Sequence, residues 1–301
     1  MPLNRSLSDW VMLFTLVVTW GSAFALNKIA LQAMPPMTMV AGRLVIAAVV
    51  LLAVNAYQGH SLWLPWRRWG FFIILAVIGN CVPFFLITWG QLSIDSALAG
   101  ILMAVIPLLT LLLAHFAHQS ERITLYKLIG FVIGFGGIVL LVGPEALRNL
   151  GGATFIAQLA VLGGAACYAI NVVITPFNRV NNTMVTTTAV VLISAVIMAP
   201  LAALQHTSSD LNLTTESVIA ALVLGVFGTA LPQLIFYRLV ASAGPTFYAL
   251  INYMIPVWAV FIGALFLHER PEWNAYVALA LILSGVAISQ IVRISDKNRP
   301  L

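Results

Sequence analysis

Charged residues are scarce in this chain: 8% of its 301 residues are Asp, Glu, Lys or Arg, whereas 61% are apolar. A soluble globular domain has about 25% charged and about 45–50% apolar residues. The 14 Lys and Arg and the nine Asp and Glu are too few to cover a soluble particle of this length. The composition therefore predicts an integral membrane protein. It excludes soluble enzymes, nucleic-acid-binding proteins and disordered proteins.

Sequence motifs typical of metal sites and of catalytic sites are also scarce. The two cysteines, Cys81 and Cys167, lie in apolar runs, where a free cysteine behaves as a small hydrophobic residue. His115 and His118 share a helix face but have no third ligand beside them. The sequence contains no H-E-x-x-H motif, no G-x-S-x-G motif and no pair of acids inside an apolar run. We therefore predict no metal, no cofactor and no enzymatic activity.

Carboxylates are missing from the middle of the apolar runs. Asp9, Asp95, Glu121 and Glu269 all lie near the ends of runs. Proton-driven export commonly depends on an Asp or Glu inside the membrane. The sequence therefore favours facilitated diffusion, or coupling by another route, and argues against export of lipophilic cations.

The apolar runs themselves are long, and ten of them reach the length of about 20 residues that a membrane-spanning helix needs. They cover residues 10–29, 39–56, 69–92, 97–116, 125–142, 154–175, 184–204, 217–240, 246–267 and 274–292. The runs lack the two-residue alternation of a β-barrel. The sequence predicts an all-α integral membrane protein with ten transmembrane helices. We expect the first helix to be retained, because no A-x-A-like cleavage site follows it.

Lys and Arg fall unevenly on the two sides that this topology defines. Ten lie on the side of both termini and three lie on the other side, while Arg43 lies inside a run. An excess of Lys and Arg marks cytoplasmic loops. Both termini are therefore predicted to be cytoplasmic.

The two halves of the chain share a pattern of Gly, Pro and Glu-Arg residues. The matching residues are Gly79 and Gly228, Pro83 and Pro232, and Pro107 and Pro256 at a separation of 149, then Glu121–Arg122 and Glu269–Arg270, and Gly137 and Gly285, at 148. Each half holds five runs, an odd number, so the second half enters the membrane with opposite polarity. Inverted repeats of this kind are typical of secondary transporters, whose substrate site lies near the midplane. We predict one transmembrane domain made of a first five-helix repeat, residues 1–148, and a second, inverted repeat, residues 149–301.

Four prolines of this pattern lie in the middle of apolar runs: Pro83, Pro107, Pro232 and Pro256. Proline removes a backbone donor and kinks or weakens a helix. Tolerated kinks in crowded helices are the simpler interpretation. Because the positions are matched between the halves, we favour hinges around a cavity that opens alternately to the two sides.

Amide and aromatic side chains gather in the first, third, fourth, sixth, eighth and ninth runs, where we expect a central cavity. Interhelical hydrogen bonding is the simpler explanation for any single amide. As a set, neutral amides between aromatic walls suit a small zwitterion or a neutral metabolite. The predicted substrate-binding residues are Trp20, Phe24, Asn80, Phe84, Tyr168, Asn171, Gln233, Tyr237, Tyr248 and Asn252.

Charged residues near the non-cytoplasmic side have two interpretations each. Lys28 closes the first run and Arg43 lies about one turn into the second. Both side chains could extend to lipid headgroups, or they could form a positive outer mouth that attracts a carboxylate. We expect Glu121 and Glu269 each to cap the helix that follows it, where the helix dipole favours an acid. A latch of a gate is the alternative.

The segments WGSAFALNK (20–28), AGRL around Arg43, and the paired Glu-Arg segments followed by glycine-spaced runs resemble EamA-type members of the drug/metabolite transporter superfamily. The resemblance covers essentially the whole chain and extends to the branch of bacterial amino-acid exporters that includes exporters of aromatic amino acids. It implies ten spans in two inverted repeats and export of small metabolites across a bacterial inner membrane. One departure is Pro176, which stands where the family has a Lys at the end of the first span of the second copy.

The predicted function is an inner-membrane exporter or facilitative carrier of amino acids and related small metabolites that works by alternating access. Its predicted partners are the small-molecule substrate and the lipid bilayer; we expect no nucleic acid and a monomeric protein. The alternatives are broad-specificity efflux of hydrophobic drugs and, from another class, a channel. A channel needs a ring of repeated pore-lining residues, which two repeats form poorly.

Overall fold

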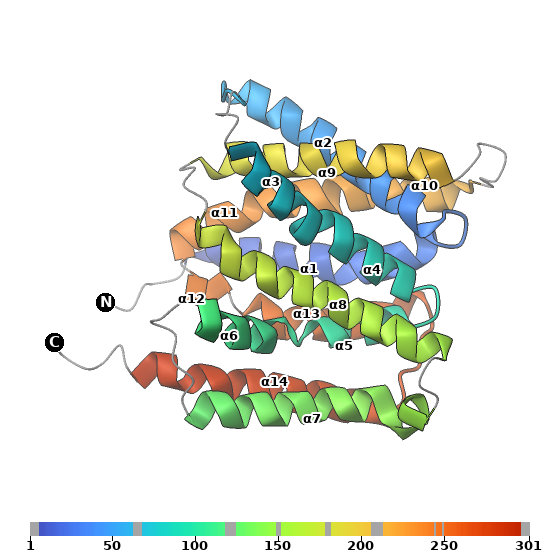
Figure 1. The fold of residues 1–301 in the computed structure, drawn as a ribbon, viewed down its shortest axis with the longest axis vertical. Helices are drawn as coiled ribbons and strands as arrows, with labels where there is room; N and C mark the ends of the chain where they lie inside the picture. The colour runs from blue at the N-terminus through green and yellow to red at the C-terminus, as the bar shows by residue number, and fades with distance from the viewer. Residues whose placement is uncertain are drawn as a thin grey trace.

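The computed structural model of the chain describes residues 6–62, 68–117, 125–148, 152–177, 182–205, 213–243, 245–248 and 250–295. Within these ranges all regular elements are helices (Figure 1). Their bounds are α1 (Leu7–Ala30), α2 (Pro36–Tyr57), α3 (Trp69–Ala76), η2 (Val77–Cys81), α4 (Val82–Gly90), α5 (Ser96–Met103), α6 (Ile106–Ala117), α7 (Leu125–Arg148), α8 (Ala153–Ile174), η3 (Thr175–Phe177), α9 (Thr183–Gln205), α10 (Thr215–Gly225), η5 (Val226–Ala230), α11 (Leu231–Ala243), α12 (Pro245–Tyr248), α13 (Ile251–Phe266) and α14 (Trp273–Ser295).

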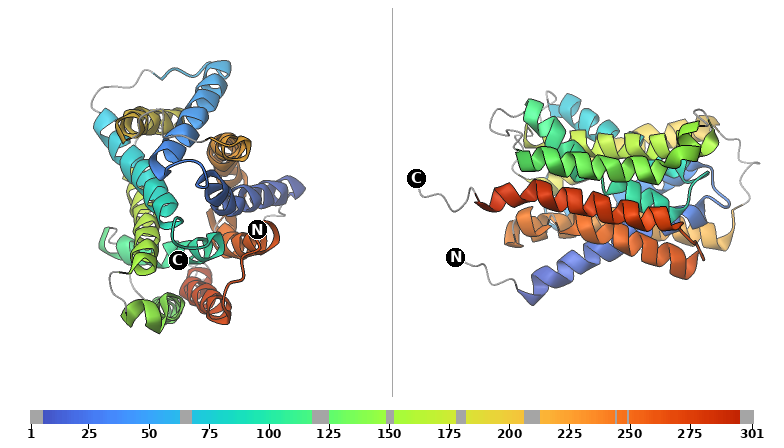
Figure 2. Two further views of the ribbon diagram at one scale, coloured as in Figure 1. Left: turned by 90° about the vertical axis from the view of Figure 1, so that its right-hand side faces the viewer. Right: turned by 90° about the horizontal axis from the view of Figure 1, so that it is seen from below.

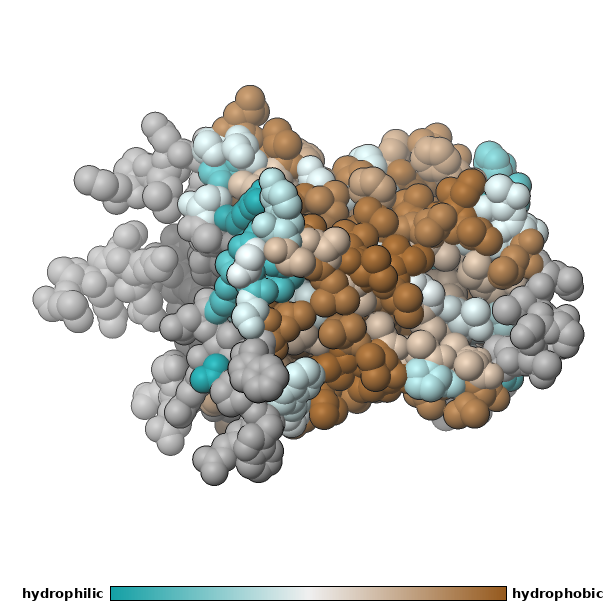
Figure 3. All heavy atoms as spheres, turned by 90° about the horizontal axis from the view of Figure 1, so that it is seen from above, coloured by the Kyte–Doolittle hydropathy of each residue, from teal (hydrophilic) through white to brown (hydrophobic). Residues whose placement is uncertain are grey.

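The helices have the length and composition of membrane spans. In the described part of the chain, eight helical segments are long and apolar enough to cross a bilayer, and two shorter apolar helices cover Ile251–Phe266 and Trp273–Ser289. A broad belt of hydrophobic side chains crosses the middle of the molecular face seen in Figure 3, and hydrophilic residues lie toward both ends of that face. The protein is therefore a multi-pass membrane protein.

The start of the first helix and the end of the last helix lie at one end of the helix bundle. The long helices lie roughly along one axis and alternate in direction, and the start of α1 lies at the same end as the end of α14 (Figures 1 and 2). We call this end of the bundle the terminal end and the other the opposite end. Helices α2 and α9 lie side by side along one edge, and α7 and α14 lie side by side along the other.

Two long spans contain a short π-helical segment immediately before a proline. These segments are η2 and η5, and each starts 149 residues from its counterpart, at Val77 and Val226. Pro83 and Pro232 are the second residues of the helices that follow, α4 and α11. Proline has no N–H to donate to the carbonyl one turn earlier. A local π turn is one way in which a membrane helix accommodates this loss.

The other two prolines have different surroundings. Helix α5 ends at Met103 and α6 begins at Ile106, so the span breaks just before Pro107. Helix α13 instead continues through Pro256. In this span the break lies earlier, between Tyr248 at the end of α12 and Ile251 at the start of α13. The break therefore lies next to Pro107 in one span but not next to Pro256 in the other.

Helices α7 and α14 pack backbone to backbone through small residues. A Cβ atom added to Gly137 would lie 2.9 Å from the carbonyl oxygen of Ala278, and one added to Gly285 would meet the carbonyl oxygen of Gly130. The two contacts are equivalent, because 278 and 285 follow 130 and 137 by 148 residues. Small residues allow membrane helices to approach this closely.

Substitution of Gly130 by Ala should therefore destabilise the protein, because the new methyl group would meet backbone atoms of α14, including the amide nitrogen of Ser289 at 2.8 Å. Overpacking of this kind costs about 1–3 kcal/mol. We expect Gly130→Ala to lower the Tm in detergent by at least about 3 °C. Gly136→Ala on the same helix is the matched control, because its Cβ would have no neighbour within 4 Å. Equal Tm values for the two variants would contradict this packing.

Candidate functional site

A cavity of about 580 Å³ lies between the helices. Nine of the ten predicted substrate-binding residues line it: Trp20, Phe24, Asn80, Phe84, Tyr168, Asn171, Gln233, Tyr248 and Asn252. The side chain of Tyr237 lies outside the described residues. Pro107 and Arg43 also line the cavity, whereas Lys28, Pro83, Pro232 and Pro256 are not among the lining residues. The cavity thus brings together residues from both halves of the chain.

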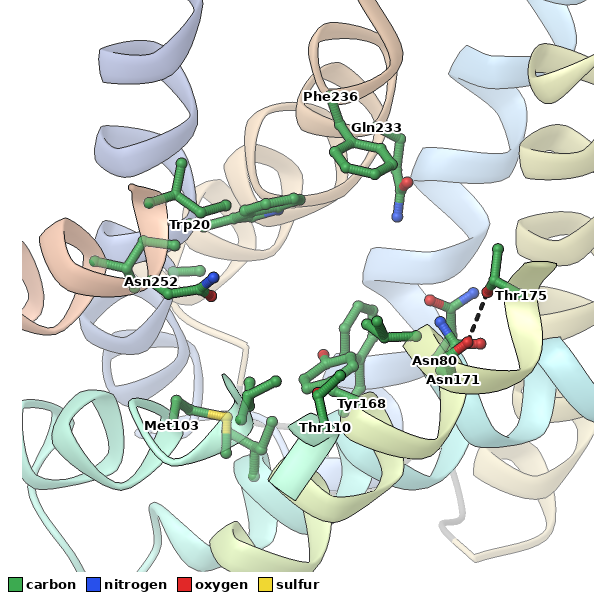
Figure 4. A pocket seen from close by; sticks show the side chains of 18 of the residues that line it. Trp20, Asn80, Met103, Thr110, Tyr168, Asn171, Thr175, Gln233, Phe236 and Asn252 are labelled. Carbon is green, nitrogen blue, oxygen red and sulfur yellow. Dashed lines mark hydrogen bonds between the residues drawn. The ribbon is translucent and has the colours of Figure 1, made fainter. Parts of the chain in front are cut away.

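The walls of the cavity alternate amide and aromatic side chains. In Figure 4, Asn80 and Asn171 lie together on one wall, across the cavity from Trp20 and Asn252. The Asn80 amide nitrogen donates to Ser194 Oγ at 3.0 Å. The buried Asn171 Oδ1 has no hydrogen-bond partner in the described part of the chain. This oxygen is packed against Gly79, where an added Cβ atom would lie 3.0 Å from it.

Aromatic rings form the apolar part of the walls. The Phe84 and Tyr168 rings meet edge to face with centroids 6.5 Å apart. The Phe236 and Tyr248 rings meet in the same way at 4.7 Å. Such pairs fix one another's orientation. The cavity therefore has rigid flat surfaces beside its polar groups.

The cavity extends toward the terminal end of the bundle. Its lining includes Ala114 near the end of α6, Lys127 near the start of α7 and Thr175 directly after α8. All three helix ends lie at the terminal end (Figure 1). A solute could therefore approach the central residues from this side.

At the opposite end, a hydrogen-bond network surrounds the end of α4. Lys28 Nζ donates to the carbonyl oxygens of Gln91 and Ile94, each at 2.8 Å. The Gln91 side chain is fully buried; it donates to the Phe24 carbonyl oxygen at 2.8 Å and accepts from Asn27 Nδ2 at 3.0 Å. Lys28 therefore binds the last carbonyls of a helix, where a cation is favoured, and it does not extend to lipid headgroups.

At the same end, Glu269 binds the start of α5. Its carboxylate accepts from the Ser96 backbone N–H at 2.8 Å, from Ser96 Oγ at 2.9 Å and from the Ala97 backbone N–H at 2.9 Å. The prediction that Glu269 caps the helix after it is therefore wrong. The free N–H groups of α5 lie beside the carboxylate, and helix N-termini favour an acid. Glu121 lies outside the described residues.

Arg43 is buried at the cavity wall, with 5% of its surface exposed. Its Nε donates to Thr229 Oγ1 at 2.8 Å and its Nη2 donates to the Gly228 carbonyl oxygen at 3.2 Å. Gly228 is the residue four positions before Pro232, so its carbonyl lacks the usual helical donor. The guanidinium also lies 3.9 Å above the Phe84 ring centroid. The interpretation of Arg43 as a side chain that extends to headgroups is therefore wrong.

The two π segments each bind a helix of the other half. Asn80 in η2 donates to Ser194 in α9, and Thr229 in η5 accepts from Arg43 in α2. Asn80 and Thr229 are 149 residues apart. The same crossed contact is thus made with different chemistry, amide to hydroxyl in one half and guanidinium to hydroxyl in the other.

The second, fifth, seventh and tenth predicted spans also line the cavity, which was not predicted from the sequence; the fifth does so through Lys127 and the tenth through Ser289. Arg43 from α2 and Thr186 and Thr187 from α9 line it. The signal was the run Thr186–Thr188 in an otherwise apolar stretch, because polar residues there need a partner. Thr187 Oγ1 is buried without a hydrogen bond in the described ranges.

The described residues contain no group of three His, Cys, Asp or Glu side chains placed to hold a metal ion. His118 lies outside the described residues. The chemistry that the cavity does offer is hydrogen bonding, aromatic stacking and the charges of Arg43 and Lys127.

Comparison with known proteins gives a consistent match. The model of the EamA-like transporter family matches residues 9–143 and, a second time, residues 155–290. The uncharacterized transporter YoaV of Bacillus subtilis is 24% identical over 92% of this chain and 95% of its own length. The uncharacterized inner membrane transporter YedA of Escherichia coli is 25% identical over 92% of this chain and 88% of its own. A solved crystal structure that is 23% identical has the same fold, with a TM-score of 0.67 over 95% of this chain and 98% of that one.

Proposed function

Because the chain belongs to the EamA-like transporter family, we propose that this membrane transporter carries amino acids and related small metabolites by alternating access. The observation that carries the proposal is the central cavity of about 580 Å³, whose lining extends toward the terminal end. Hydrogen bonds of Lys28, Gln91 and Glu269 join helices at the opposite end, and we infer that they close it. A carrier needs a site that faces one side at a time. The cavity has the size of a small-molecule site, about 300–1,000 Å³.

We propose ten transmembrane helices in two inverted repeats, residues 1–148 and 149–301, related by a pseudo-two-fold axis in the membrane plane. The double match of the family model supports this, as do the π segments 149 residues apart. The equivalent contacts of Gly137 with Ala278 and of Gly285 with Gly130 support it as well. Elements of one half then have counterparts in the other that move in the opposite sense.

The lining of the cavity supports this substrate class. Amides such as Asn80, Gln233 and Asn252 can bind the polar groups of a small molecule, and Trp20 and Tyr168 offer flat apolar surfaces. An amino acid with a large side chain presents both kinds of group. We propose that the protein acts as a monomer in a bacterial inner membrane, with both termini cytoplasmic, so that the terminal end faces the cytoplasm. We also propose that it exports its substrate down the substrate gradient.

Uptake of radiolabelled amino acids into proteoliposomes, in competition with a panel of metabolites and hydrophobic drugs, tests the substrate class. We expect saturable uptake of at least one amino acid and competition by its analogues. Transport of the drugs without transport of any amino acid would contradict the proposal and favour broad drug efflux.

We propose that Pro83, Pro107, Pro232 and Pro256 act as hinges. In Pro232→Ala the new N–H can restore the hydrogen bond to Gly228 that the helix lacks. The stiffer helix should slow exchange by about threefold to tenfold while the protein stays folded. The initial rate of exchange in proteoliposomes measures this, with Pro200→Ala in α9 as a control. An unchanged rate for Pro232→Ala and Pro83→Ala would remove the hinges from the mechanism.

We further propose that transport needs no proton gradient. None of the described cavity-lining residues is Asp or Glu, so the site lacks the acid on which proton coupling commonly depends. An imposed pH gradient should therefore leave the substrate at equal concentrations inside and outside the liposomes. Accumulation that an uncoupler abolishes would contradict this and point to Asp95, Glu121 or Glu269 as proton sites.

A further inference from the structure

We infer that Arg43 is the binding site for a carboxylate of the substrate, so that the protein selects small organic monoanions and zwitterions by this group. The inference rests on the proposed function and adds to it the chemical group that the cavity recognises. It also assigns a role to a cation that was predicted to lie at the outer mouth.

Arg43 has neutral hydrogen-bond acceptors and no carboxylate among the described residues of the cavity lining. The guanidinium is buried, and both of its hydrogen-bond acceptors, Thr229 Oγ1 and the Gly228 carbonyl oxygen, are neutral. None of the described residues that line the cavity is Asp or Glu. A charge inside a membrane protein is costly and is normally paired or placed beside a substrate pathway. The described lining of the cavity therefore supplies no carboxylate to balance the charge of Arg43.

The Arg43 guanidinium has N–H donors that the described protein acceptors leave unused. A guanidinium has five N–H donors. Protein acceptors within the described ranges use two of them, one on Nε and one on Nη2. The remaining three include both donors on Nη1. Donors on the two terminal nitrogens of Arg match the two oxygens of a carboxylate.

The Arg43 guanidinium is held in place by aromatic rings. The Phe84 ring lies 3.9 Å from Arg43 Cζ, and the Tyr168 ring packs against Phe84. Arginine stacks on aromatic faces in this way. All three residues line the cavity. Since the guanidinium is held on one face and along one edge, little conformational freedom is lost when a ligand binds it.

The described lining of the cavity lacks a negatively charged partner for an amine. No acidic side chain in the described lining could pair with an ammonium group. The unpaired amide oxygens of Asn27 and Asn171 carry no charge and are themselves buried, so they do not replace an acidic partner for an amine. We therefore infer that a carboxylate is required for recognition and that an amine is not. At the central part of the cavity the single charge of Arg43 matches a monoanion better than a phosphate dianion; the second cation of the lining, Lys127, lies near the terminal end.

A panel of phenylalanine analogues tests the inference on the wild-type protein. The probes are 3-phenylpropanoate, which lacks the amine, phenethylamine, which lacks the carboxylate, and inorganic phosphate as an unrelated anion. We expect 3-phenylpropanoate to inhibit labelled phenylalanine uptake within about threefold of unlabelled phenylalanine. Phenethylamine should be at least about tenfold weaker, which corresponds to about 1.4 kcal/mol, and phosphate should have no effect. Equal inhibition by phenethylamine and 3-phenylpropanoate, or inhibition by phosphate, would overturn the inference.

Two variants locate the effect at Arg43. In Arg43→Gln the preference for 3-phenylpropanoate over phenethylamine should fall below about threefold, whereas Arg43→Lys should keep part of it. Lys127→Gln is the matched control, because Lys127 is the other cation of the cavity lining. Loss of the preference in Lys127→Gln but not in Arg43→Gln would overturn the assignment.

Thermal shifts of the purified wild-type protein separate this inference from the proposed function. We expect 3-phenylpropanoate to raise the Tm and phenethylamine to leave it unchanged. If no amino acid is transported but this pattern of shifts holds, the proposed function is wrong and the carboxylate site stands. If phenylalanine is transported but 3-phenylpropanoate produces no shift and no inhibition, the carboxylate site is wrong and the carrier function stands.

Discussion

Simultaneous substitution of Asn80, Tyr168, Gln233 and Asn252 by Ala should reduce transport at least about a hundredfold. These residues come from four different spans and all line the cavity. A hydrogen bond contributes about 1 kcal/mol, so four lost contacts amount to about 4 kcal/mol, or about a thousandfold. Because contributions within one site are not additive, we expect a reduction of at least about a hundredfold and not the full thousandfold. The initial rate of amino-acid uptake in proteoliposomes, normalised to folded protein, measures the effect.

A control variant with four Ala substitutions on the same spans shows whether a loss of transport comes from the binding site or from misfolding of the protein. Its four substitutions by Ala fall on exposed residues, 45–51% accessible, that face away from the cavity: Ile73, Leu159, Leu222 and Val257. This variant should transport within about threefold of wild type. If the cavity variant kept the rate and selectivity of wild type, the assignment of the site would be wrong.

Removal of the Glu269 carboxylate should open the opposite end of the protein. In Glu269→Ala the start of α5 loses three hydrogen-bond acceptor contacts, from Ser96 N, Ser96 Oγ and Ala97 N. Hydrogen bonds to charged groups contribute about 1.5–3 kcal/mol each. A net loss of about 2 kcal/mol shifts the balance between closed and open forms about thirtyfold.

Labelling of a cysteine in the cavity measures this opening. Ala23 lines the cavity on α1, one turn before Asn27, so Ala23→Cys in a variant that lacks Cys81 and Cys167 provides the probe. An impermeant maleimide added on the side of the opposite end should react at least about thirtyfold faster in Glu269→Ala than in the parent. Glu272→Ala is the control, because Glu272 lies in the same connection and its side chain makes none of the contacts with α5. Equal rates for Glu269→Ala and Glu272→Ala would show that Glu269 does not hold the closed end.

The sequence predicted the local part of the fold well, because a membrane span is encoded by a continuous apolar run. The predicted run 184–204 corresponds to α9, Thr183–Gln205, and the run 154–175 to α8, Ala153–Ile174. The π turns at Val77 and Val226 leave no mark on hydropathy and became visible only in the structure. The matched prolines did point to the right two spans for them.

Contacts between the halves could not be predicted, because they join residues far apart in the chain. Glu269 and Ser96 are 173 residues apart, and Arg43 and Thr229 are 186 apart. Local rules therefore assigned Glu269 to the helix that follows it and Arg43 to the membrane surface. The amide and aromatic residues of the cavity were easier to find, since a polar side chain in an apolar run needs either a partner or a ligand.

Counterflow in proteoliposomes tests alternating access most directly. Liposomes are loaded with a high concentration of unlabelled substrate and diluted into a trace of labelled substrate. A carrier with one site that faces each side in turn should accumulate the label transiently above its outside concentration, and the Asn80, Tyr168, Gln233 and Asn252 variant should not. Entry of label that only approaches the outside concentration, whatever the internal load, would contradict a carrier and indicate a channel.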